Sequence, residues 1–172
     1  MSGYKDKSDL VLKEAERRRE KNRIADVEEE KVKVVIFTLA GGWYAFSSGE
    51  IKEIISHANI FYVPGAPDFI HGLINIRGDI ESVINLNMFL RLPDNVKAQS
   101  GRVLVAAVEG GIRSGILVDS VEDVLDIPAS SVKSPLSTLN KSVREFVAGE
   151  FIHGRETVIL LSVEKIFEKI TV

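Results

Sequence analysis

Beyond position 31, apolar residues come in short runs separated by glycine pairs and polar clusters, without a helical period. The run VVIFTL at 34–39 is followed by Gly41-Gly42 and then by WYAF at 43–46. β-Branched and aromatic residues favour strands, and glycine readily adopts the positive φ that a tight turn needs. This pattern predicts a β-hairpin.

The same pattern occurs three more times, each time as two apolar runs around a glycine turn. The runs lie at 69–76 and 80–86, at 103–109 and 112–118, and at 146–152 and 157–161. The four hairpins form two sets of two, offset by 69 residues at the glycine pairs and by 77 between Phe69 and Phe146. Each set closes in a short helix-like segment, at 88–90 and 163–170. An internal repeat of tightly turned strands predicts two small, similar barrels packed together in one all-β unit.

Residues 1–31 have a different texture, because 18 of them are charged and the apolar ones form only a ragged stripe. Glu14 and Arg18 are a favourable i,i+4 pair, and Ser8 or Asp9 is a suitable helix cap. We expect a charged N-terminal arm, helical or disordered, at 1–31 and a β domain at 32–172.

Composition narrows the classes of function. The net charge is −3, so the chain lacks the basic surface that a nucleic-acid-binding protein needs. There is no cysteine, which excludes disulfides and thiolate chemistry. No apolar run approaches the roughly 20 residues of a membrane helix, and the first residues lack a signal-peptide core. We expect a cytoplasmic protein without membrane insertion.

Recognisable catalytic motifs are absent from the sequence. The three histidines do not form an H-E-x-x-H pair, no serine lies in a G-x-S-x-G elbow, and no glycine pattern matches a phosphate-binding loop. We therefore expect no catalytic residue, metal or cofactor, and favour a binding protein over an enzyme.

Arg77 is the most conspicuous polar residue, since apolar strands flank its turn. In one interpretation it is only the polar end of a hairpin, paired with Asp79. In the other it is a recognition arginine, because a guanidinium is always charged and can bind carboxylates with two hydrogen bonds. The residues alone leave both open.

Several segments resemble the CheW family of chemotaxis proteins, in that family's order and spacing. They are 35–46, IKEI at 51–54, FIHGLINIRG at 69–78, GILVDSVEDVL at 115–125 and FVAG at 146–149. The similarity covers about 32 to 170. It implies two five-stranded SH3-like β-barrel lobes packed together, with a short C-terminal helix.

The resemblance also implies a non-enzymatic adaptor. Such a protein couples the cytoplasmic tip of a chemoreceptor to the regulatory domain of a CheA-type histidine kinase, and further copies of the coupling protein join as partners. It implies recruitment to receptor arrays at the inner face of the membrane. The partner-binding residues carried over are Ile51, Glu53, Ile54, His71, Gly72, Asn75, Ile76, Arg77 and Gly78, with Gly72 kept small where backbones approach closely.

Glu81, Ser82 and Asn85 depart from the family pattern, which is more apolar before an acidic residue. They leave open a coupling protein of a type IV pilus, gliding or developmental pathway. The alternative from another class of function is an enzyme with a polar cleft between the lobes. An oligonucleotide-binding barrel is disfavoured because acidic residues outnumber basic ones. Since the sequence ends at Val172, we expect no receiver domain behind the coupling domain.

Overall fold

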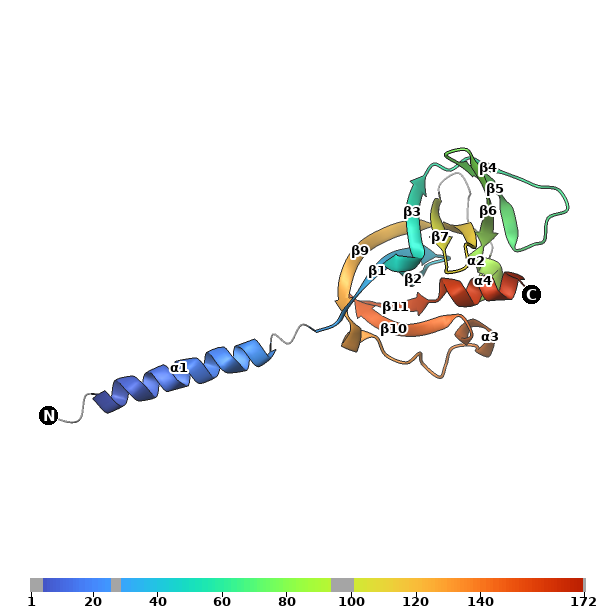
Figure 1. The fold of residues 1–172 in the computed structure, drawn as a ribbon. Helices are drawn as coiled ribbons and strands as arrows, with labels where there is room; N and C mark the ends of the chain where they lie inside the picture. Colours follow the sequence, from blue (N-terminus) through green and yellow to red (C-terminus); the bar gives the residue numbers. More distant parts are fainter. Residues whose placement is uncertain (1–4, 26–28, 94–100, 172) are drawn as a thin grey trace. The chain divides into compact units, whose positions relative to one another are not determined.

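The computed structural model describes residues 5–25, 29–93 and 101–171. The chain divides into two compact units, 1–30 and 31–172. Their strands and helices are drawn in Figure 1. Each unit is considered by itself.

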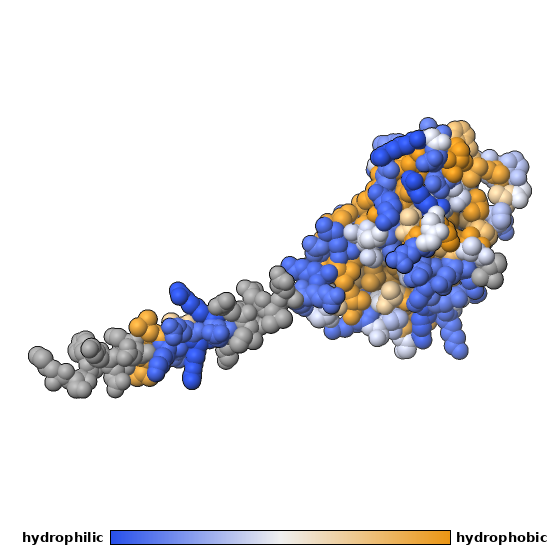
Figure 2. Space-filling view, in the orientation of Figure 1, coloured by the Kyte–Doolittle hydropathy of each residue, from blue (hydrophilic) through white to orange (hydrophobic). Residues whose placement is uncertain are grey.

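The first unit contains a single helix, α1 (Lys5–Ala25). Its described side chains are exposed all round, including Leu10, Val11 and Leu12 at 62, 69 and 61%. Figure 2 shows a small apolar area on this helix and hydrophilic side chains along the rest of its described surface. A helix that is polar on every side is stabilised by its own i,i+4 pairs or by a partner. Within the described parts of the chain, no helix has the length and apolar character to cross a membrane.

The second unit is built almost entirely from antiparallel strands. The first half supplies β1 (Lys31–Leu39), β2 (Gly42–Ser47), the 3₁₀ turn η1 (Ser48–Glu50), β3 (Ile51–Ser56), β4 (Ile60–Phe61), β5 (Ile70–Ile76), β6 (Asp79–Asn85) and helix α2 (Leu86–Leu90). The second half supplies β7 (Arg102–Ala107), β8 (Arg113–Val118), β9 (Ser120–Pro128), the 3₁₀ turn η2 (Ala129–Ser131), α3 (Lys141–Arg144), β10 (Val147–His153), β11 (Glu156–Leu161) and α4 (Val163–Thr171). All four predicted hairpins are confirmed.

The two halves of the sequence exchange strands. One sheet has the order β10-β11-β2-β1-β9 and is called the first lobe; the other has the order β3-β7-β8-β6-β5-β4 and is called the second lobe. Each lobe therefore combines a hairpin from one half of the sequence with a longer segment from the other half. The joints are parallel pairs, β11 with β2 and β6 with β8. The predicted modules thus combine both halves of the repeat.

Strand number differs slightly between the lobes. The first has five strands, and a bridge with two backbone hydrogen bonds between Lys133 and Glu150 joins its outer segments. The second has six, because the two-residue β4 pairs with β5. The predicted all-β architecture of two SH3-like lobes is confirmed, and β4 is an addition that no sequence pattern indicated.

Strand alternation divides the apolar side chains among three cores. Along β1, Val34 and Ile36 point into the first lobe, whereas Val35 and Phe37 enter a core shared by the two lobes. β7 does the same, with Val103 and Val105 inside the second lobe and Leu104 and Ala106 in the shared core. A strand buried on both faces carries an unbroken apolar run. Burying each large side chain contributes about 1.5–3 kcal/mol.

Helix α4 covers the shared core with Val163, Ile166 and Phe167. The carboxylate of Glu50 accepts a hydrogen bond of 3.1 Å from the Val163 backbone nitrogen at the start of this helix. Burial raises the pKa of Glu50, and hydrogen bonds from backbone nitrogens oppose the increase. A first-half carboxylate therefore caps the C-terminal helix of the second half.

Candidate partner-binding site

The turn between β5 and β6 presents Arg77 in a defined backbone conformation. Arg77 and Gly78 both have positive φ, +55° and +99°. Two such residues between paired strands form the tight turn that matches the twist of a hairpin. The side chain of Asn75 accepts a hydrogen bond of 2.9 Å from the Gly78 backbone nitrogen and fixes the turn from one side.

The guanidinium of Arg77 reaches strand β3. Its Nη2 lies 3.0 Å from Oε1 of Glu53, and the two side chains are 82% and 30% exposed. Among the described residues, Arg77 is thus paired with Glu53, whereas the sequence suggested Asp79. Glu53 lies opposite Val105, an interior residue, so its carboxylate is on the inner face of the sheet. The ion pair spans from the hairpin turn to the first strand of the lobe.

Two of the predicted site residues are buried. Ile76 is 3% exposed and belongs to the interior core of the second lobe. Gly72 is buried beside β4, where a Cβ atom would lie 2.5 Å from the Phe61 carbonyl oxygen. Both residues shape the hairpin from within. The expectation that Gly72 is small because backbones approach closely agrees with this geometry.

The remaining predicted residues are spread along two strands. Ile54 is 39% exposed, whereas Ile51 is half-buried and packs against the shared core. His71 is half-buried at the far end of β5. Arg77 lies six positions further along the chain, roughly 20 Å away in an extended strand. The structure therefore brings Glu53, Asn75, Arg77 and Gly78 together and leaves His71 apart.

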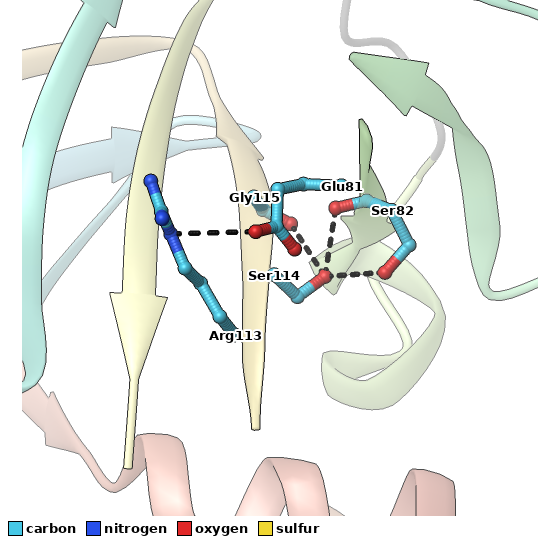
Figure 3. A network of polar contacts seen from close by, with 5 residues as sticks. All are labelled: Glu81, Ser82, Arg113, Ser114 and Gly115. Atoms are coloured by element: carbon cyan, nitrogen blue, oxygen red, sulfur yellow. Dashed lines mark hydrogen bonds and ion pairs between the residues drawn. The ribbon is translucent and has the colours of Figure 1, made fainter. Parts of the chain in front are cut away.

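On the other side of the turn lies a polar network between β6 and β8, shown in Figure 3. Ser114 Oγ donates to the Ser82 carbonyl oxygen at 2.8 Å and lies 2.8 Å from Ser82 Oγ. Arg113 Nε lies 3.5 Å from Oε1 of Glu81, an ion pair that is not a hydrogen bond, so charge attraction holds this contact. Glu81 and Ser82, two polar residues between the apolar Ile80 and Val83 of β6, are the signal for this network in the sequence.

The first lobe repeats several of these features. His153 Nε2, at the end of β10, lies 3.7 Å from Asp123 Oδ2 on β9, as Arg77 approaches Glu53 on β3. Gly149 repeats Gly72, because a Cβ there would lie 2.5 Å from Val132 Cγ1. The repeat in the sequence therefore extends to a contact between a hairpin side chain and a carboxylate on β3 or β9.

Among the described residues, apolar side chains of the shared core pack between the two lobes. In the described part of the chain, no three acidic, histidine or cysteine side chains are grouped to hold a metal ion. Among the described residues, Tyr44 and Glu50 have a shifted pKa, and burial raises the pKa of each. These shifts follow from packing.

A family model described as CheW-like domain matches residues 33–171. The chain belongs to the CheW-like domain family. The match covers nearly the whole second unit and leaves α1 outside. The resemblance drawn from the sequence motifs is confirmed.

Among solved structures, the chain is similar to the scaffolding protein TtCheW from Thermoanaerobacter tengcongensis, with 28% identity and a TM-score of 0.66. The alignment covers 77% of this chain and 89% of that one. The chemotaxis protein CheW of Treponema pallidum is 26% identical, over 82% of this chain and 85% of its own. Protein PilI of Pseudomonas aeruginosa is 24% identical, over 67% and 64%.

Proposed function

We propose that this protein is a non-enzymatic adaptor that couples a chemoreceptor to a CheA-type histidine kinase in chemosensory signalling. The partners are the cytoplasmic tip of the receptor and the regulatory domain of the kinase, with further coupling-protein copies in the same assembly. The protein acts in the cytoplasm, recruited to receptor arrays at the inner face of the membrane. Membership of the CheW-like family and the similarity to proteins named CheW support this function.

The observation that carries the proposal is the Arg77 turn. Its guanidinium is exposed, yet the ion pair to Glu53 and the Asn75 hydrogen bond restrict its orientation. An oriented arginine binds a partner carboxylate with little loss of side-chain entropy. Exposed Ile54 and Ile80, at 39% and 62%, add apolar surface on the neighbouring strands. Arginine beside apolar surface is a common composition of binding hot spots.

An adaptor transmits a signal only if its contacts differ between the signalling states of its partners. The receptor changes kinase activity when one state binds this surface more tightly than the other. The protein itself supplies oriented contacts and forms no bond with a substrate. This mechanism needs no metal, cofactor or catalytic residue.

A second candidate function is coupling in a pathway with another output, such as type IV pilus movement, gliding or development. The similarity to protein PilI favours it. The larger number of relatives named CheW favours chemotaxis. The same binding surface serves in either case, and the identity of the cognate receptor distinguishes them.

The decisive experiment titrates the full chain against a CheA-type regulatory domain and a receptor-tip fragment from its own organism, by calorimetry. Arg77→Ala is compared with wild type and with Arg155→Ala, the exposed arginine of the β10–β11 turn in the first lobe. Circular dichroism verifies that each variant folds. We expect saturable binding by wild type and Arg155→Ala, and about tenfold weaker receptor binding by Arg77→Ala. A folded wild type that binds neither partner would refute the adaptor function.

A further inference from the structure

We infer that the polar network of Glu81, Ser82, Arg113 and Ser114 positions the Arg77 turn for partner binding. These four are positioning residues, since they act through Arg77 and not by contact with a partner. The effect on binding rests on the proposed function. The effect on the turn is a property of the free protein and can be tested alone.

The argument begins with the extent of the backbone ladder. Strand β6 pairs with β8 only at Val83↔Gly115, Ile84↔Ile116 and Asn85↔Leu117. Strand β6 itself begins at Asp79, directly after the turn. The segment 79–82 therefore lies beyond the paired positions of β6 and β8, and the side chains of Ser82 and Glu81 add contacts to β8 there.

Ser114 on β8 contacts Ser82 on β6, one position beyond the last paired residues of the two strands. It is 4% exposed, and its hydroxyl donates to the Ser82 carbonyl oxygen at 2.8 Å. A serine hydroxyl has one hydrogen, so the 2.8 Å contact between the two Oγ atoms is then donated by Ser82. The two serines form a reciprocal pair that satisfies a backbone carbonyl where the ladder ends.

The ion pair of Glu81 and Arg113 joins β6 and β8 one position closer to the turn. Glu81 lies opposite the interior residue Ile74, so both its carboxylate and the Glu53 carboxylate are on the inner face of the sheet. The Glu81 and Arg113 side chains are 17% and 34% exposed. Partial burial lowers solvent screening, which makes this contact stronger than a fully exposed pair.

The turn is consequently held from three directions. The β5 ladder holds one side, the contact of Arg77 with Glu53 holds the tip, and the network attaches β6 to β8. A turn released on the β8 side would populate orientations in which the guanidinium misses its partner. The apparent affinity for the partner would then fall, because only the molecules whose turn is correctly oriented can bind it.

The first test needs no partner. Amide hydrogen exchange and ¹⁵N relaxation at 76–82 are measured for wild type, Ser114→Ala, Ser82→Ala and Glu81→Gln. Glu156→Gln is the matched control, because Glu156 begins β11 as Asp79 begins β6 and is exposed. Losing one hydrogen bond or one partly buried ion pair corresponds to roughly two- to tenfold faster exchange. We expect this range for Ser114→Ala and Glu81→Gln, less for Ser82→Ala, and no change for the control.

The second test is a double-mutant cycle on the binding of the receptor-tip fragment. We expect Ser114→Ala and Glu81→Gln to weaken binding about two- to tenfold when Arg77 is present. In an Arg77→Ala background the same substitutions should have no further effect. If Ser114→Ala does not fold, Ser82→Ala and Glu81→Gln provide the same cycle.

Each result has one meaning. Unchanged exchange at 76–82 in folded variants overturns the inference, and so does a loss of binding that persists without Arg77. If wild type binds no fragment, the proposed function fails. Amide exchange and ¹⁵N relaxation at 76–82 then decide alone whether the network positions the turn.

Discussion

Arg77 Nη2 and Glu53 Oε1 lie 3.0 Å apart although 24 residues separate them in the sequence. The pair joins the tip of a hairpin to β3, the first strand of the second lobe. Exposed ion pairs stabilise proteins by only about 0–1 kcal/mol, and Arg77 is largely exposed. The contact therefore matters for orientation more than for stability.

Substituting Glu53 should separate these two effects. We expect Glu53→Gln to change the free energy of unfolding by less than about 1 kcal/mol. Receptor-tip binding should weaken, because the guanidinium loses its charged anchor. Urea denaturation and calorimetric titration measure the two quantities. The double charge exchange Glu53→Arg with Arg77→Glu is the control, since it keeps an ion pair and reverses the exposed charge. Full binding by that double variant would contradict a recognition role for Arg77.

A second substitution removes the guanidinium and improves the turn. Asparagine tolerates positive φ better than most residues, and Asn-Gly is the preferred pair in this type of turn. We expect Arg77→Asn to keep or raise the melting temperature while lowering receptor binding as much as Arg77→Ala does. Thermal unfolding and calorimetry measure both. Wild-type affinity in this variant would show that backbone conformation, and not the guanidinium, carries recognition.

Much of the fold could be predicted from local pattern. Glycine turns between runs of β-branched residues specify hairpins, and all four form. The exchange of strands between halves could not be predicted, because the VVIFTL run shows only that β1 is buried on both faces. It does not show which strands cover it. Strand β4 was missed because two residues are too few for a pattern.

The candidate site was predicted in part. Arg77 stood out as a charged residue at a glycine turn between apolar strands. Its contact with Glu53 depends on how the lobe curves, which periodicity does not describe. Ile76 was named with its neighbours, but alternation along β5 places it in the interior. Ser114 gave no signal, since an isolated serine in a strand is ordinary until its partner on β6 is known.

Gly72 allows β4 to pair with β5, and a side chain there should break that pairing. A Cβ would lie 2.5 Å from the Phe61 carbonyl oxygen and 2.7 Å from Ile60 Cγ2. We expect Gly72→Ala to destabilise the protein by about 1–3 kcal/mol. Gly149→Ala should do the same in the first lobe, where Val132 Cγ1 and the Lys133 carbonyl oxygen are 2.5 and 2.9 Å away.

Gly49→Ala is the control for both glycines, because the nearest atom to its Cβ is Ser47 Oγ at 3.8 Å. Chemical denaturation measures all three variants. Amide exchange then locates the damage, at 60–61 and 72–74 for Gly72→Ala and at 132–133 and 149–150 for Gly149→Ala. Equal stability of the three variants would show that the strands can separate at no cost.

The raised pKa of Glu50 predicts how stability depends on pH. Burial raises this pKa above its ordinary value of 4.5, so the folded chain holds the proton more tightly than the unfolded chain. The contribution of Glu50 to stability is therefore complete below pH 4.5 and declines as the pH rises through the folded pKa. Glu50→Gln keeps an oxygen that accepts from the Val163 backbone nitrogen and cannot ionise. We expect its stability to exceed that of wild type increasingly as the pH rises above 4.5.

Urea denaturation between pH 4 and 8 measures this difference. Glu168→Gln, on the exposed face of α4, removes the same charge without a buried carboxylate and should follow wild type. Glu50→Ala removes the cap as well and should be about 1 kcal/mol less stable than Glu50→Gln at every pH. A wild-type advantage over Glu50→Gln that grows with pH would mean that the ionised carboxylate stabilises α4 more than its burial costs. The hydrogen bonds from backbone nitrogens would then outweigh desolvation.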